Sequence, residues 1–89
     1  MVTALLTNHA QVLLWVAAHG QMPVREVAAS LALGKRTVLR ILADLEHAGY
    51  LTKRRTGRSN QYVIHGEQPV WIQALPNVTV NDLLRVRPR

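Results

Sequence analysis

The sequence predicts a mainly α-helical domain of the α+β class, in which three helices precede a two-stranded β-hairpin and a short helix follows. Apolar residues recur every three or four positions between residues 8 and 48, which is the helical period. Between residues 50 and 64 they alternate with polar residues on either side of a turn at Thr56–Ser59, which is typical of a hairpin. The chain of 89 residues is long enough for one domain.

The first helix is predicted to begin at Thr7 or Asn8, with Gln11 in an approximate capping-box position three residues after Asn8. It should run through Ala18 and stop at Gly20, because glycine readily adopts the left-handed conformation that follows a helix. Its apolar residues form two surfaces rather than one. The first is a core stripe of Val12, Leu13 and Val16, and the second consists of Leu14, Trp15 and Ala18.

A helix–turn–helix pattern follows. Pro23 suits the first position of a second helix of about two turns, whose apolar residues are Val24, Val27, Ala28 and Leu31. Leu33 and Gly34 make the turn, and Gly34 is an acceptable cap for the third helix, which is predicted over residues 35–48 and should end at Gly49. Its core-spaced residues are Val38, Ile41, Leu42 and Leu45.

The hairpin is predicted to occupy residues 50–64, with strands at Tyr50–Arg55 and Asn60–Ile64. Alternation directs Leu51, Tyr62 and Ile64 toward the core and leaves the arginines near the turn in solvent. These elements define a first unit, residues 1–66. The tail, residues 67–89, is irregular at first and then forms a short helix at Val80–Val86, which Thr79 and Asp82 open with a small capping box.

The charge distribution indicates a polyanionic partner. The net charge is +6, and seven of the eleven Lys and Arg residues lie between Lys35 and Arg58, against only Asp44 and Glu46. A cluster of like charges can be no more than a solvated face, but here it coincides with the helix–hairpin pattern. That coincidence favours duplex nucleic acid as the partner.

Several classes of function are disfavoured. The chain has no cysteine, which excludes thiolate metal sites and cysteine nucleophiles. We expect no enzyme, because no nucleophile motif, phosphate-binding loop or paired carboxylates are found, and no metal or other cofactor. None of the four histidines has another potential ligand at i, i+4 spacing. The longest apolar run, residues 12–18, is too short to cross a bilayer and no secretory signal is present, so we expect no membrane partner and a cytoplasmic location.

Three stretches resemble small bacterial transcription regulators of the MarR-like and ArsR-like kind, whose fold is the winged helix–turn–helix. They are LTNHAQVLLWVAAHG in the first helix, VREVAASLALGKRTVLRILADLEHAGYL in the helix–turn–helix, and GRSNQY in the hairpin. The resemblance covers roughly residues 6–65. It implies sequence-specific binding to double-stranded DNA, with the third helix as the reading element in the major groove and the hairpin as a wing on the backbone or in the minor groove.

Within this scheme, we expect the outward-facing residues of the third helix to contact DNA: Lys35, Arg36, Thr37 and Arg40. Arg36 and Arg40 are the best candidates for reading bases, because a guanidinium can grip guanine with two parallel hydrogen bonds, whereas Lys35 and Thr37 suit phosphate oxygens. Leu39 could touch a thymine methyl group or, as is commoner, pack on its neighbours. The wing candidates are Lys53, Arg54, Arg55 and Arg58.

The chain has no room for the long terminal helices with which MarR-like proteins dimerise. Either the tail folds back over the first helix of its own chain, or two copies bury these surfaces mutually; we favour a homodimer. The interface residues would be Leu14, Trp15, Ala18, Trp71, Leu83 and Leu84. The alternative function is a winged-helix module for protein–protein interaction that uses the apolar surface around Trp15 and Trp71.

Overall fold

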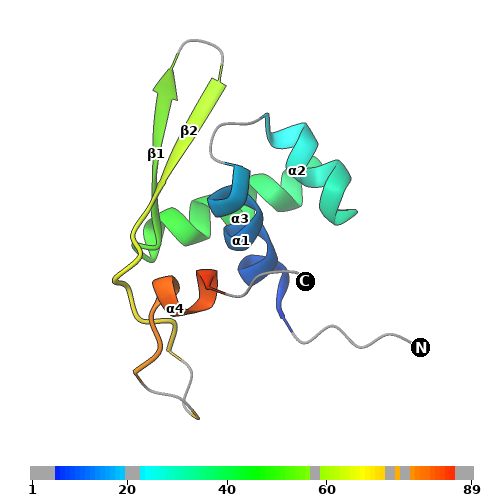
Figure 1. Cartoon of the computed structure of the whole chain (residues 1–89). Coiled ribbons are helices and arrows are strands. Elements are labelled where there is room, and N and C mark those ends of the chain that lie inside the picture. The colour runs from blue at the N-terminus through cyan, green and yellow to red at the C-terminus, as the bar shows by residue number, and fades with distance from the viewer. Residues whose placement is uncertain (1–5, 20–22, 57–58, 72–73, 75–76, 86–89) are drawn as a thin grey trace, which may run out of the picture.

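The computed structural model describes residues 6–19, 23–56, 59–71, 74 and 77–85. Three helices come first: α1 (Asn8–His19), α2 (Val24–Leu31) and α3 (Lys35–His47). The antiparallel hairpin of β1 (Leu51–Thr56) and β2 (Ser59–Ile64) follows, and then α4 (Val80–Leu84). In Figure 1, α1 crosses in front of α3, α2 lies at one end of α3, and the hairpin rises from the other. The fold is therefore the predicted winged helix–turn–helix.

The start of α1 depends on Thr7, whose Oγ1 accepts a hydrogen bond from the N–H of Ala10 at 3.3 Å. The predicted capping box between Asn8 and Gln11 is wrong. The Gln11 side chain instead donates to the carbonyl oxygen of Leu6 at 3.1 Å, which ties down the residue before the cap. The helix ends at His19, one residue beyond the prediction, and Gly20 lies outside the described residues.

Both ends of α2 differ from the prediction. Pro23 is the cap of α2 rather than its first helical residue, since its ψ of 145° is extended. At the other end, Ala32 adopts a left-handed φ of 54°, which a non-glycine residue rarely does. This conformation brings the N–H of Leu33 to the carbonyl of Ala28 at 2.9 Å and turns the chain sharply. Gly34 then caps α3, as predicted.

Gly49 ends the third helix as predicted. Its φ is +88°, and the N–H of Tyr50 bonds back to the carbonyl of Leu45 at 2.9 Å, which is the bonding pattern of a Schellman motif. A Cβ at Gly49 would lie 2.6 Å from the amide nitrogen of Gln68, the mobile end of a side chain in the tail, so it is the positive φ that requires glycine here.

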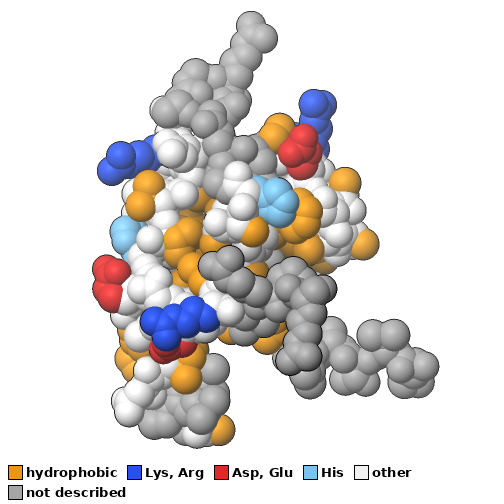
Figure 2. Space-filling model, in the orientation of Figure 1, with side chains coloured by type: hydrophobic (Ala, Val, Ile, Leu, Met, Phe, Trp, Pro, Cys, Tyr) orange, Lys and Arg blue, Asp and Glu red, His pale blue; other side chains and the backbone are white. Residues whose placement is uncertain are grey.

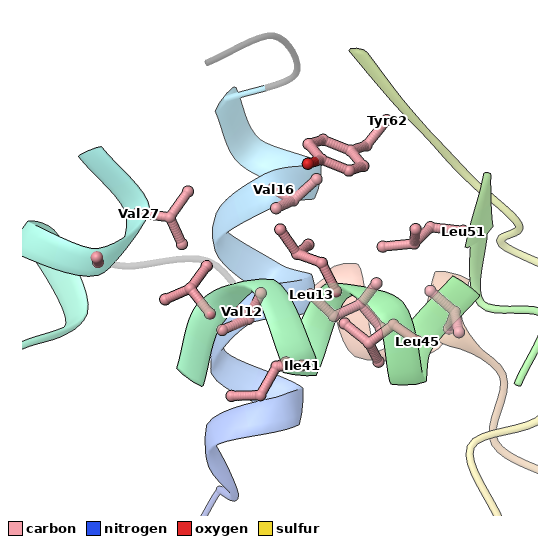
Figure 3. Close-up of a cluster of buried hydrophobic side chains, with 12 residues drawn as sticks. Val12, Leu13, Val16, Val27, Ile41, Leu45, Leu51 and Tyr62 are labelled. Carbon is pink, nitrogen blue, oxygen red and sulfur yellow. The ribbon is translucent and has the colours of Figure 1, made fainter. Parts of the chain in front are cut away.

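One hydrophobic core joins all the helices and the hairpin. Figure 3 shows side chains from α1, α2, α3 and both strands pointing into a single cluster. All seven core positions predicted on α1 and α3 are buried, and Leu51 and Tyr62 are 1% and 7% exposed, as the alternation of the strands predicted. The buried residues are Val12, Leu13, Val16, Val27, Ala28, Val38, Ile41, Leu42, Leu45, Leu51, Tyr62 and Val80.

The tail packs against this same core. Val80 in α4 is fully buried, and Val70 and Leu84 pack against the cluster. Backbone hydrogen bonds from Val80 to Gln68 at 2.8 Å and from Asn81 to Gly66 at 2.8 Å hold α4 under the base of the hairpin. The described part of the tail therefore packs on the core of its own chain.

The predicted capping box opens α4: Thr79 accepts from the N–H of Asp82, and the Asp82 carboxylate accepts from the N–H of Thr79 at 2.9 Å. These hydrogen bonds from Thr79 lower the pKa of Asp82 below its usual value. The helix ends at Leu84, and Val86, to which it was predicted to extend, lies outside the described residues. No helix in the described ranges is long and apolar enough to cross a membrane.

Candidate nucleic-acid interface

The side of α3 away from α1 carries the cations of the predicted reading helix. Lys35, Arg36 and Arg40 are exposed, whereas Thr37 is half-buried and so presents less of its surface than predicted. The opposite side of the helix is buried in the core. Arg36 and Arg40 are four residues apart, so they lie one above the other on the exposed side of the helix.

The wing cations divide between the two faces of the hairpin. In the strand register, Lys53 lies opposite Tyr62 and Arg55 lies opposite Asn60, while Arg54 lies opposite Gln61. Successive residues of a strand point to opposite faces, so Lys53 and Arg55 share the face of Tyr62 and Arg54 points to the other. All three cations are exposed, and Arg58 lies outside the described residues.

A crevice of about 70 Å³ lies between the reading helix and the wing. From the helix, Leu39 and Ala43 line it beside Glu46, and from the hairpin Lys53 lines it beside Tyr62. Lys53 is therefore adjacent to the exposed edge of α3. Of the candidate cations, Lys53 lines this crevice, next to the middle and C-terminal part of α3.

Both carboxylates of α3 have partners in other elements. Glu46 Oε2 accepts a hydrogen bond from the backbone N–H of Lys53 at 3.1 Å, which ties the end of α3 to the first strand. Asp44 Oδ2 lies 2.9 Å from Nε2 of His9 in α1. Sequence reasoning missed both contacts, because nothing in the local pattern identifies a partner that is 35 residues away along the chain.

The candidate cations are free of acidic partners. Among the described residues, Arg85 is the one Lys or Arg side chain that forms an ion pair, with Asp82 at 3.7 Å. The six described candidates, Lys35, Arg36, Arg40, Lys53, Arg54 and Arg55, are exposed and form none. Unpaired cations can neutralise phosphates without first breaking an ion pair.

Figure 2 shows the face of the molecule on which α1 and α4 lie in front of α3. On it, Lys and Arg side chains occur at separate points near the edges, with hydrophobic side chains between them. No cationic surface extends across the described residues of this face.

Tyr62 of β2 is buried in the hydrophobic core and so anchors the wing to the helices. Burial raises the pKa of its hydroxyl above the ordinary value of 10.0, a hydrogen bond with the Asn60 side chain opposes that shift, and the Glu46 charge adds to it. The phenol is thus neutral at physiological pH. Asn60 lies within β2, as the predicted strand Asn60–Ile64 implied.

The residues predicted to form the dimer interface lie in different environments. Trp15 packs against the core, and its ring stacks on His19 with centroids 3.8 Å apart. Leu84 packs against the core and Leu83 lines a neighbouring cavity, whereas Ala18 is exposed and Leu14 is half-buried. Trp71 is 79% exposed and has a left-handed φ of 58°.

His9, His19 and His65 each have a polar partner. His65 Nε2 lies 2.6 Å from Thr52 Oγ1, and His19 Nδ1 lies 2.9 Å from the carbonyl oxygen of Trp15. Within the part of the chain that the structure describes, no group of three or more potential ligands could hold a metal ion.

A tight turn ahead of an exposed basic helix, with a hairpin beside that helix, defines the class of winged-helix proteins. Residues 5–59 match the model of the MarR family. The chain belongs to this family of winged-helix transcription regulators. These regulators are not enzymes, in agreement with the expectation from the sequence.

A curated relative supports the same class. Over 68 residues, the chain is 36% identical to the arsenic resistance transcriptional regulator ArsR1 of Pseudomonas putida. The aligned region covers 76% of this chain and 53% of the relative, so the chain spans about half the length of that protein.

Proposed function

We propose that this chain is a sequence-specific regulator of transcription that binds double-stranded DNA, with residues 35–48 in the major groove and the wing, residues 50–64, on the backbone and in the adjacent minor groove. One observation carries the proposal. Lys53 of the wing borders the same crevice as Leu39 and Ala43 of α3, so this wing cation lies beside the helix that carries the exposed and unpaired Arg36 and Arg40. A duplex presents phosphates on both sides of the groove that a helix enters.

The geometry supports different roles for these cations. Arg36 and Arg40 occupy the first turns of α3, from which side chains reach base edges most readily, and we assign them to guanine. Lys35 and Lys53 are assigned to phosphate oxygens, with Thr37 in a lesser role because it is half-buried. Arg55 shares the face of Lys53 and is the described wing arginine best placed to enter the minor groove, together with Arg58 at the turn. Arg54 is assigned to the backbone from the other face.

Selection of bound duplexes from a random pool tests this function directly. A recovered inverted repeat with a conserved half-site is the expected result. Recovery of duplexes without a common sequence would contradict sequence-specific binding, and recovery of no duplex would contradict DNA binding altogether.

Replacement of single cations should separate base reading from phosphate contact. Arg40→Ala should cost about 1–3 kcal/mol on the preferred duplex and relax the base preference at one position. Lys53→Ala should weaken binding to all duplexes about equally. Competition binding against single-base variants of the selected site measures both effects. If both variants lost affinity with unchanged base preference, the roles assigned to Arg40 and Lys53 would be wrong.

We propose a homodimer as the DNA-binding species, with reading helices about one duplex turn apart, or about 34 Å. The exposure of Trp71 supports this, since a large apolar side chain in solvent is characteristic of an interface. Because Leu84 and Trp15 are partly used in packing within the chain, Trp71 and Ala18 would form the accessible part of the contact.

Sedimentation tests the dimer. Trp71→Ala should shift the protein toward monomer, whereas Leu6→Ala, at another exposed apolar side chain, should leave the association unchanged. A monomer at high concentration for the unaltered protein would contradict this proposal.

The name of the relative associates it with arsenic resistance. Soft metal and metalloid ions are held in proteins by thiolates, and this chain has no cysteine. We therefore propose that the chain shares the DNA-binding architecture of that protein without a thiolate sensing site of its own. The alternative of a protein-interaction module predicts partner binding that survives charge reversal at Arg36 and Arg40, whereas DNA binding should not survive it.

A further inference from the structure

Leu39 is a large apolar residue on the exposed, basic side of α3. It lies in the middle of the basic face of α3, three residues after Arg36 and directly before Arg40, and 45% of its surface is exposed. The four core residues of the same helix are each at most 5% exposed. About half of the Leu39 side chain is thus presented to whatever approaches the helix.

The exposed half of Leu39 borders the crevice between α3 and the wing. Leu39, Leu42, Ala43 and Glu46 form its helix side, and Lys53 and Tyr62 form its hairpin side. Its volume of about 70 Å³ suits one small group, since a water molecule occupies about 30 Å³ in the liquid. Glu46 and Lys53 form the polar part of its wall, and Leu39, Leu42 and Ala43 form an apolar part that a small apolar group covers more favourably than water does.

One apolar group is available in the major groove of DNA, the C5 methyl of thymine. We propose that Leu39 and the crevice beside it bind this methyl group, so that the protein selects a thymine on the wing side of the bases read by Arg36 and Arg40. This inference rests on the proposed function and adds a specificity-determining residue to it. The thymine is distinguished by burial of its methyl group, whereas the neighbouring guanines are distinguished by hydrogen bonds.

The test uses the duplex recovered from the random pool, with each thymine of one half-site replaced in turn by deoxyuridine. This replacement removes the methyl group and leaves the pairing edge and the O4 acceptor in place. At one position, affinity should fall by about fourfold, as expected for loss of one buried methyl-sized group. The other thymines should show no comparable loss.

The Leu39→Ala variant should bind thymine and deoxyuridine duplexes with equal affinity at that position. Because Leu39 is half-exposed, its truncation should leave the fold intact, which a thermal melt would verify. Leu6→Ala, with a leucine of 42% exposure outside α3, is the matched control and should keep the fourfold preference. In a new selection, Leu39→Gln should recover adenine in place of thymine, because a glutamine side chain pairs with adenine through two hydrogen bonds.

Two failures are distinguishable. If the unaltered protein recovers no duplex, the proposed function is overturned and this inference with it. If it binds a defined site but is indifferent to deoxyuridine, or if Leu39→Ala keeps the full preference for thymine, the DNA-binding function stands and the methyl-reading role of Leu39 is overturned.

Discussion

The affinity for the selected duplex should fall by about 10³–10⁵-fold between roughly 50 and 200 mM salt, if a dimer engages about 6–10 phosphates. Each cation that meets a phosphate releases condensed counterions, and that release becomes less favourable as salt rises. The large expected effect follows from the six exposed Lys and Arg side chains of α3 and the wing that form no ion pair. Titrations at several salt concentrations give the slope of log affinity against log salt.

Single charge removals make this prediction sharper. Arg54→Gln should reduce the magnitude of the slope by about 1 per copy of the chain, since one phosphate contact per copy is lost. Arg85→Gln is the matched control and should leave the slope unchanged, because Arg85 follows α4 and pairs with Asp82. A salt-independent affinity, or equal changes for both variants, would contradict the assignment of the phosphate-binding surface to α3 and the wing.

Val80→Asp should lower the free energy of unfolding by about 3–5 kcal/mol, which is the usual cost of an uncompensated buried charge. Val80 is fully buried, and the core residues around it are apolar, so a carboxylate there would lack a partner. For a domain of this size the loss corresponds to a melting temperature lower by on the order of 20 °C. Thermal and urea unfolding would measure it.

Ala74→Asp is the control for this second prediction. It adds the same charge to the same tail, but at an exposed position, and should change stability by less than about 0.5 kcal/mol. If Val80→Asp were as stable as Ala74→Asp, the tail would not be part of the folding unit. Loss of stability in Val80→Asp alone would show that the winged helix requires residues beyond the hairpin.

The order and ends of the elements were predicted from the sequence because their signals are local. Gly34 and Gly49 mark the ends of α3, and Thr79 and Asp82 cap α4 within a single turn. The turn between α2 and α3 is the place where the local pattern gave the wrong conformation. Ala32 takes the left-handed conformation that the turn between α2 and α3 requires, although nothing in its side chain favours that conformation.

The candidate interface could be predicted as a set of residues but not as a surface. Lys53, Arg54 and Arg55 are consecutive in the sequence, and only the pairing of Lys53 with Tyr62 decides which of them share the face beside α3. In the same way, Leu39 is recognisable as outward-facing from its helical position. Its role depends on the crevice that the wing forms beside it.

The amino-acid sequence by itself determined the fold class, the reading helix and the excess of positive charge, because periodicity, caps and composition act over a few neighbouring residues. The tertiary structure alone decided that Asp44 pairs with His9, that Glu46 anchors the wing through the Lys53 backbone, and that the tail buries Val80 in the common core. These contacts join residues far apart along the chain. Their geometry arises only when the helices and the hairpin pack together, since no local pattern encodes the distance between two elements.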